Sequence, residues 1–275
     1  MGMTMKLQRY WIGLLPLIMS CLFAPVLATE PQAEQADANF PLRFVYKNIP
    51  IIDHLTLYKQ LESTIVIDVR SKHEYDTLHI KGALNISISN LGFITRIKKL
   101  RVQDSRQIVF YCNGITCEKS YKASDKAIKN GITNVATMDL GIFGWIEAFP
   151  DAAVILGEDT VPEDRLITKE KYQLHLLSPD EFVAKIDKSV MVIDIREHYH
   201  RDPVILEGVT RVASSDKVLG LLRKAKNNQQ TILFYDAVGK QTPWLQYLIE
   251  KIGVENYYFM DGGVKAYVEA GLPID

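Results

Sequence analysis

Two cysteines five residues apart in one short segment are the side chains of this chain best suited to chemistry. Residues 108–111 form an apolar run typical of a buried strand, Cys112 ends that run, and a helical pattern follows from residue 121. A thiol between a strand end and a helix N-terminus lies among free backbone N–H groups at a positive dipole end, which favours the thiolate. We therefore predict that Cys112 is a nucleophile; the alternative is an inert buried cysteine.

The residues after Cys112 are expected to form a cradle for a negatively charged sulfur. The backbone N–H groups of a curled loop stabilise an anion, and Gly114 permits the backbone angles that such a curl requires. The residues assigned to this cradle are Asn113, Gly114, Ile115, Thr116, Glu118, Lys119 and Ser120.

Cys117 has three interpretations. It resolves a persulfide or sulfenate on Cys112 through an intraloop disulfide, it binds a metal together with Cys112, or it is a small packing residue. Two thiolates alone are an incomplete metal site, and the nearest histidine in the sequence is His79. We favour the resolving role, and we predict neither a metal nor a cofactor.

The first 28 residues have the pattern of an export signal. Lys6 and Arg9 precede an uncharged, largely apolar run over residues 11–28, which ends on the small-residue pattern of a signal-peptidase site. We expect cleavage and an exported, periplasmic location. The alternatives are an uncleaved membrane anchor and lipid attachment at Cys21.

Charge and cysteine content restrict the partners. The chain has a net charge of −1, and removal of the signal leaves −3. Without a basic run, a nucleic-acid partner is not expected, nor is a membrane once the signal is cleaved. The two cysteines that remain are too few and too close together for the disulfide framework of an exported protein, so they indicate chemistry.

The chain also repeats itself. Residues 65–70 are echoed by 191–196, and residues 108–112 by 232–236, with separations between 122 and 126 residues over the whole set of echoes. A nearly constant separation of about one domain length indicates duplication. The predicted organisation is a signal peptide (1–28), a disordered spacer (29–43), a first domain (44–157), a linker (158–171) and a second domain (172–275).

Each half alternates short apolar runs with helical patterns. The runs at 65–69 and 108–111 lack period-two alternation, which suits strands buried on both faces. Residues 125–129 and 245–252 have helical patterns. Strands that alternate with helices predict an α/β fold in which each half is a parallel sheet flanked by helices on both faces.

The order of these motifs resembles the rhodanese family. The resemblance rests on Asp68-Val69-Arg70, Glu74-Tyr75, the stretch His79 to Ala83, a strand that ends in Tyr-Cys, and a closing Gly-x-x-x-Trp element at residues 141–145. It extends as a tandem pair from about residue 44 to 275. It implies that the loop cysteine accepts a sulfane sulfur as a persulfide and passes it to cyanide or a thiol. The implied partners are a small sulfane-sulfur donor and a thiol acceptor, with a periplasmic protein as a further option.

Two departures from the family pattern bear on function. The second half has Asp236 where the cysteine belongs, and because a carboxylate cannot carry sulfane sulfur, that half is expected to be silent. The first loop is two residues longer than the second and has Glu118 and Lys119 in place of an arginine. The acidic residue opposes a dianionic donor such as thiosulfate, and the missing arginine weakens a phosphatase interpretation. The loop instead resembles that of exported rhodanese-like proteins with a Cys-x-x-x-x-Cys loop followed by Ser120, a subgroup linked to periplasmic quinoprotein oxidation.

The remaining signature residues are given structural roles. Asp68 and Arg70 are expected to support the loop as an ion pair, and His79 to brace the following turn. Further aromatic and histidine residues are expected to pack in the core or between the halves (Phe143, Trp145, Trp244, Tyr247, Tyr257, Tyr258) or to lie at the surface (His198, His200).

Three functions are compatible with these patterns. We favour an exported sulfurtransferase with Cys112 as nucleophile and Cys117 as resolving thiol. One alternative is a non-catalytic binding or scaffold module, and the other is a periplasmic dithiol redox protein that uses the Cys112–Cys117 pair.

Overall fold

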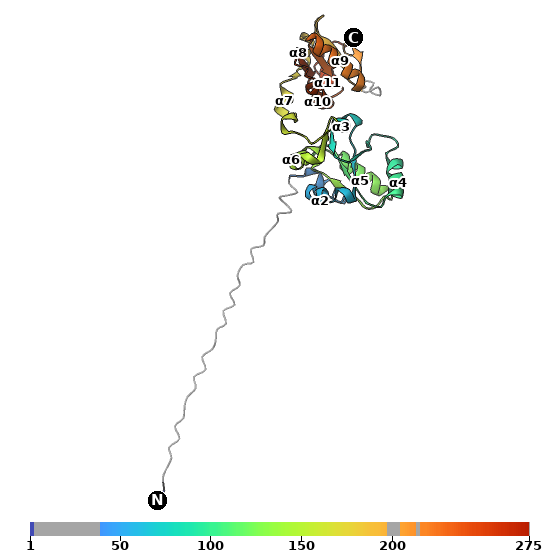
Figure 1. Cartoon of the computed structure of the whole chain (residues 1–275), viewed down its shortest axis with the longest axis vertical. Helices are drawn as coiled ribbons and strands as arrows, with labels where there is room; N and C mark the ends of the chain where they lie inside the picture. Colours follow the sequence, from blue (N-terminus) through green and yellow to red (C-terminus); the bar gives the residue numbers. More distant parts are fainter. Residues whose placement is uncertain (3–38, 197–203, 213–214, 275) are drawn as a thin grey trace.

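The computed structural model describes residues 1–2, 39–196, 204–212 and 215–274, and two α/β domains follow each other along this part of the chain (Figure 1). Residues 3–38, which include most of the predicted signal peptide and most of the predicted spacer, lie outside the described residues, as do His198 and His200. At the end of the predicted spacer, η1 (Pro41–Phe44) is a 3-10 helix, and Arg43 donates to the Asp139 carboxylate at 2.7 Å.

The first domain is built on a four-stranded parallel sheet with the order β3-β1-β4-β5. Its strands are β1 (Thr64–Asp68), β3 (Leu84–Asn85), β4 (Gln107–Tyr111) and β5 (Val135–Met138). Its helices are α2 (His54–Lys59), η2 (Leu61–Ser63), α3 (Lys72–Thr77), α4 (Phe93–Gln103), α5 (Lys119–Lys129), α6 (Gly141–Ala148) and η3 (Pro150–Ala152). A small antiparallel sheet beside it contains β2 (Leu78–Ile80), β6 (Ala153–Ile155) and β7 (Glu158–Asp159).

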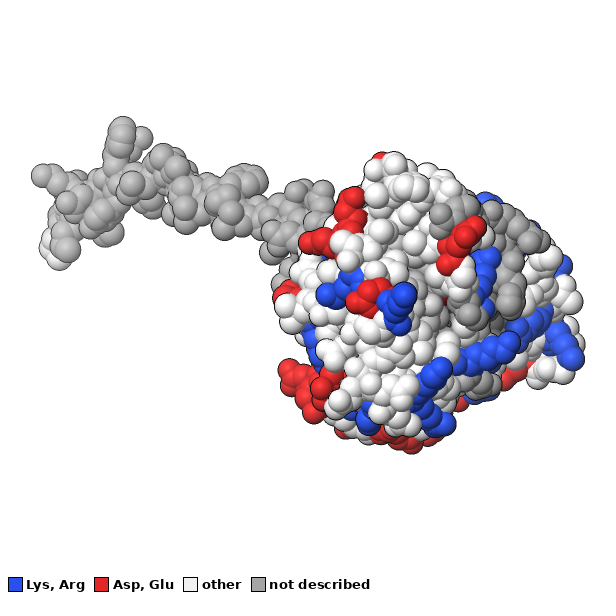
Figure 2. Space-filling model, turned by 90° about the horizontal axis from the view of Figure 1, so that it is seen from above, with Lys and Arg blue, Asp and Glu red and all other residues white. Residues whose placement is uncertain are grey.

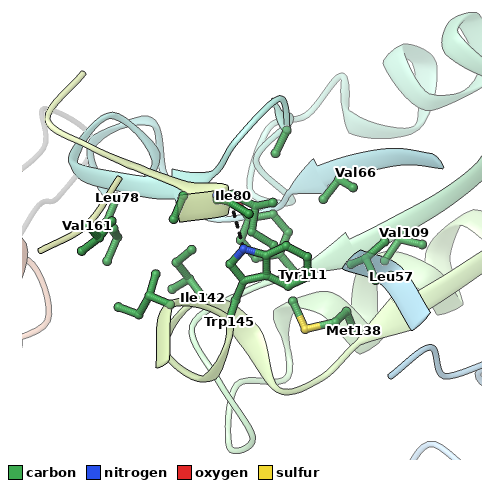
Figure 3. Close-up of a cluster of buried hydrophobic side chains, with 14 of the residues drawn as sticks. Leu57, Val66, Leu78, Ile80, Val109, Tyr111, Met138, Ile142, Trp145 and Val161 are labelled. Carbon is green, nitrogen blue, oxygen red and sulfur yellow. Dashed lines mark hydrogen bonds between the residues drawn. The ribbon is translucent and has the colours of Figure 1, made fainter. Parts of the chain in front are cut away.

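The two faces of the first sheet have separate cores. Val66 and Val109 pack with α2 and α6 on one face, whereas Ile65, Ile67 and Phe110 pack with α4 and α5 on the other. Burial on both faces explains why the strands are continuously apolar rather than alternating. Figure 3 shows the first of these cores around Trp145, which is fully buried and donates from Nε1 to the carbonyl of Ala152 at 3.0 Å.

The second domain repeats this plan. Its five-stranded parallel sheet has the order β10-β9-β11-β12-β8. Its strands are β8 (Leu176–Leu177), β9 (Met191–Asp194), β10 (Thr210–Arg211), β11 (Ile232–Tyr235) and β12 (Tyr257–Met260). Its helices are η4 (Glu163–Arg165) and α7 (Lys169–Gln173), which precede the sheet, then α8 (Pro179–Ala184), α9 (Ser215–Asn228), α10 (Thr242–Ile252) and α11 (Gly263–Glu269). One core lies under α9 and α10 and another under α8 and α11, which confirms the predicted α/β fold with helices on both faces of each parallel sheet.

The second domain contacts the first through α10. Trp244 and Tyr247 belong to the same buried cluster as Trp145, and the ring of Trp244 stacks on Phe143 at 5.4 Å between centroids. The Tyr247 hydroxyl accepts a hydrogen bond from the backbone N–H of Ile167 at 3.3 Å. These two aromatics therefore lie between the halves.

The other two aromatics assigned to core or interface pack within the second domain. Tyr257 stacks on His175 at 3.9 Å between ring centroids, and Tyr258 packs against the core under α8 and α11.

Lys and Arg side chains lie beside Asp and Glu side chains on the face shown in Figure 2, in keeping with a net charge close to zero.

Within the described ranges, none of the helices combines the length and the apolar character needed to cross a bilayer.

Candidate functional site

The predicted loop lies at the carboxyl end of β4, one of the two inner strands of the first sheet. Cys112 follows β4 directly, and α5 begins seven residues later at Lys119. The carboxyl ends of parallel strands are where α/β proteins bind ligands, because loops and helix N-termini meet there. The loop therefore occupies the position that the sequence predicts for a reactive site.

The Cys112 side chain is buried beneath this loop. Its exposed fraction is 1%, and it packs with the apolar residues under α4 and α5. The Sγ donates to the carbonyl oxygen of Cys117 at 3.1 Å and lies 3.3 Å from the Ser120 hydroxyl.

This burial contradicts the expectation that the surroundings of Cys112 favour its thiolate. Loss of solvent raises the pKa of Cys112 well above its usual value, and the hydrogen bond to Cys117 raises it further. The helix N-terminus does not compensate because the sulfur lies in the apolar layer, with its proton directed at a carbonyl. The role of Cys112 as nucleophile stays a prediction.

Cys117 has the opposite surroundings. It is partly exposed, and a hydrogen bond from the Cys112 side chain is the largest of the effects that lower its pKa to about 6. The backbone N–H groups of Asn113 and Lys119 and the charge of Lys119 act in the same direction. The surroundings of Cys117 therefore favour a thiolate more than the surroundings of Cys112 do.

Asn113 connects the loop to its surroundings. Its side-chain oxygen accepts from Arg70 Nη1 at 3.1 Å, and its Nδ2 donates to Glu74 Oε1 at 3.1 Å. Its backbone carbonyl accepts the N–H of Phe143 at 3.3 Å. The sequence assigned Asn113 only to the cradle; the structure shows that it is the loop's main anchor.

The Asp68–Arg70 pair has the predicted bracing geometry. Both side chains are fully buried, with Arg70 Nη2 2.6 Å from Asp68 Oδ2, and Tyr111 donates to the same carboxylate at 2.8 Å. Arg70 also donates to Asn113, so the pair connects β1 to the loop. Asp194 and Arg196 repeat the pair in the second half at 2.6 Å.

A tryptophan of the second domain packs against Arg70, which holds the Asn113 side chain of the loop. The Arg70 guanidinium lies 5.0 Å from the centroid of the Trp244 ring, and Trp244 stacks on Phe143. No sequence pattern linked Trp244 to the cysteine loop, because the contact joins residues of different domains.

The other cradle residues differ in exposure. Ile115 and Thr116 are exposed at the tip of the loop, and Ser120 is buried beneath it. Glu118 forms an ion pair with Lys122 one helical turn later. Lys119 lies 3.5 Å from Glu74, so the acidic and basic residues of the loop are each compensated locally.

The glycine that the loop requires is not Gly114 but Gly141. The φ of Gly114 is outside the left-handed region, whereas that of Gly141 is +69°. A Cβ on Gly141 would lie 2.3 Å from the backbone nitrogen of Gly114 and 2.5 Å from the carbonyl oxygen of Asn113. The start of α6 therefore packs directly against the backbone of the cysteine loop.

His79 has a structural environment. Its Nδ1 lies 2.7 Å from the Tyr75 carbonyl, and its ring stacks on Tyr75, whose hydroxyl donates to Ala83 across the turn. Within the part of the chain that the structure describes, no three His, Cys, Asp or Glu side chains are grouped as metal ligands.

In the second half, the side chain of Asp236 occupies the equivalent loop. The Asp236 carboxylate is buried and accepts backbone N–H groups from both sides of the loop. One oxygen accepts from Val238 at 2.9 Å and from Gly239, and the other accepts from Gln241 at 2.5 Å and Thr242 at 3.3 Å. The loop of the second half is therefore an anion cradle that its own side chain fills.

Comparison with known proteins agrees with the internal duplication. The model of the family described as Rhodanese-like domain matches residues 54–148 and 178–270. A tRNA uridine(34) hydroxylase of Bacillus cytotoxicus is 30% identical over 148 residues, which cover 52% of this chain and 40% of that protein. The corresponding protein of Streptococcus sanguinis is 33% identical over 84 residues, 30% of this chain and 25% of that one. The chain thus spans less than half the length of these curated relatives.

A solved structure is similar along most of the chain. The thiosulfate sulfurtransferase of Pseudomonas aeruginosa is 14% identical, with a TM-score of 0.36, and the match covers 86% of this chain and 69% of that one.

Substitution of Gly141 tests the contact between α6 and the loop. We expect Gly141→Ala to displace the loop and to speed alkylation of the buried Cys112, because the added methyl group overlaps the backbone of the loop that covers this thiol. Gly131→Ala is the matched control: Gly131 has a similar φ of +76°, but its Cβ would meet nothing within 4 Å. It should lose about 1 kcal/mol of stability from backbone strain alone and keep its alkylation rate. Equal alkylation rates in the two variants would contradict the contact.

Substitution of Asp236 tests the filled cradle. Asp236→Ala leaves buried N–H groups without an acceptor and should lower the free energy of unfolding by about 3 kcal/mol. Asp236→Asn keeps one acceptor oxygen and should cost less. Chemical unfolding followed by circular dichroism measures both, and an alanine variant as stable as the wild type would show that the carboxylate is not required.

Proposed function

The chain belongs to the rhodanese-like domain family, with one copy in each half, and we propose that the first copy is a sulfurtransferase whose loop cysteines carry sulfane sulfur as a persulfide. The observation that carries this proposal is the Cys112–Cys117 pair at the carboxyl end of β4, where the surroundings of Cys117 lower the pKa of its thiol. A thiolate and a cradle for a terminal anionic sulfur are the two requirements of this chemistry.

The transfer needs no redox partner. The loop thiolate attacks the outer sulfur of a donor such as thiosulfate and forms a new sulfur–sulfur bond. The old bond breaks, its electron pair leaves with sulfite, and a persulfide anion remains on the loop. An acceptor thiolate then attacks the outer sulfur, and the electron pair of the broken bond returns to the loop as a thiolate.

The exposed tip of the loop supports a small sulfur acceptor that approaches the cysteines from solvent. Ile115 and Thr116 are exposed at its tip, and Glu118 is paired with Lys122, which reduces its repulsion of an anionic donor. The second half is proposed to be silent because Asp236 fills its cradle. Export is part of the proposal and rests on the pattern of residues 1–28.

A dithiol redox function is the second candidate, because the Cys112 sulfur lies against Cys117 and both cysteines are free thiols. In that case the loop forms a disulfide and never holds an additional sulfur.

Intact-mass measurement separates these functions. After exposure to thiosulfate or a polysulfide, the reduced protein lacking residues 1–28 should gain the mass of one sulfur atom. With thiosulfate it should release one equivalent of sulfite. A variant with both cysteines changed to alanine is the control and should gain nothing. Loss of two hydrogens without a sulfur adduct would favour the redox function. No mass change with any donor would favour a binding or scaffold module.

A further inference from the structure

We infer that Arg43 is a positioning residue for the cysteine loop, because its ion pair with Asp139 joins the two helices that adjoin this loop, α5 and α6. The inference rests on the proposed function and adds to it a role for residues 40–46, called here the N-terminal strap. The strap lies outside the residues that the family model matches, 54–148 and 178–270.

The ion pair between Arg43 and Asp139 is bidentate and shielded from water. Arg43 donates from Nε to one carboxylate oxygen at 2.7 Å and from Nη2 to the other at 3.0 Å. The side chain of Asp139 is 4% exposed and that of Arg43 is 24% exposed. Two parallel hydrogen bonds to a buried carboxylate fix the orientation of the partners as well as their separation.

On one side, Asp139 is continuous with the helix that packs on the loop. α6 begins two residues later at Gly141, which lies against the loop backbone. The N–H of Ile142, in the first turn of α6, donates to the carbonyl of Cys112 at 2.9 Å. The position of Asp139 therefore affects where α6 meets the cysteine.

On the other side, the same carboxylate holds the helix that follows the loop. Tyr121, in the first turn of α5, donates from its hydroxyl to Asp139 Oδ2 at 2.6 Å. The preceding residue is Ser120, whose hydroxyl lies 3.3 Å from the Cys112 sulfur. One carboxylate thus connects both helices that adjoin the loop, and Arg43 supplies its counter-charge.

The strap has further contacts that hold Arg43 in place. The Arg43 guanidinium lies 4.0 Å from the centroid of the Phe40 ring. Tyr46 stacks on Tyr121 with 4.9 Å between ring centroids, and its N–H donates to the carbonyl of Leu42 at 2.9 Å. The strap is therefore docked on α5 by aromatic contacts as well as by the ion pair.

The equivalent residue of the second half has different surroundings. Asp261 stands two residues before Gly263, the glycine that corresponds to Gly141. Asp261 is exposed, whereas Asp139 is buried. The buried carboxylate therefore accompanies the loop that has the cysteines and is not a general requirement of the duplicated fold.

Steady-state kinetics of the full chain test the role of Arg43. The assay follows transfer of sulfur to cyanide, measured as thiocyanate, from thiosulfate or a polysulfide, whichever gives the mass adduct described above. Arg43→Ala should lower kcat about 10-fold or more and change the KM of the donor less than about 2-fold. The reason is that the cysteine loop shifts while its exposed tip, where the donor arrives, stays accessible. Arg43→Lys keeps the charge but not the bidentate geometry and should recover part of kcat.

Arg106→Ala is the matched control. Arg106 also forms a bidentate ion pair, with Asp104 at 3.0 and 2.7 Å, but it precedes β4 at the end of the strand opposite to the loop. This variant should keep kcat and KM. Tyr121→Phe is a second test that does not depend on folding of Arg43→Ala. It removes the hydrogen bond to Asp139, keeps the ring that stacks on Tyr46, and should lower kcat several-fold.

Three results overturn the inference. Wild-type kcat in Tyr121→Phe, or in an Arg43→Ala variant that is folded by circular dichroism, leaves the proposed function in place and removes the role of the strap. An equal loss of kcat in Arg43→Ala and Arg106→Ala has the same meaning, because it reflects a general loss of stability. A wild-type protein that forms no sulfur adduct with any donor overturns both this inference and the proposed function.

Discussion

Backbone N–H groups that converge on one place favour an anionic acceptor there, and the loop of the second half shows this interaction directly. Where a strand ends and the next helix begins, these donors have no intrahelical partner. In the second half the Asp236 carboxylate accepts their hydrogen bonds with both oxygens. In the first half the equivalent position holds the Cys112 thiol, and the longer loop adds a second free thiol at Cys117.

The position of the loop is fixed by contacts with the elements beneath it. The buried Asp68–Arg70 pair reaches up to Asn113, and α6 begins at Gly141 in direct contact with the loop backbone. Trp244 of the second domain covers Arg70 from the other side. The half that we propose to be silent thus has a structural task, because it covers the anchor of the half that carries the cysteines.

Much of the architecture was predictable because it depends on patterns along the chain. Continuous apolar runs indicated strands buried on both faces, the echo of residues 65–70 at 191–196 indicated two similar domains, and the structure confirms both. The bracing pair was predictable since Asp68 and Arg70 are two residues apart at a strand end. The burial of Cys112 and the partial exposure of Cys117 were not predictable, because they depend on which way each side chain turns after the end of β4. The roles of Gly141 and Trp244 were also hidden, since they arise from contacts between segments far apart in the sequence.

The crystal structure of the reduced protein after treatment with polysulfide would test the central claim most directly. Our account predicts an additional sulfur atom bonded to one of the two loop cysteines, Cys112 or Cys117, and no additional sulfur in the loop around Asp236. Two unmodified thiols, or a Cys112–Cys117 disulfide without an additional sulfur, would contradict the account.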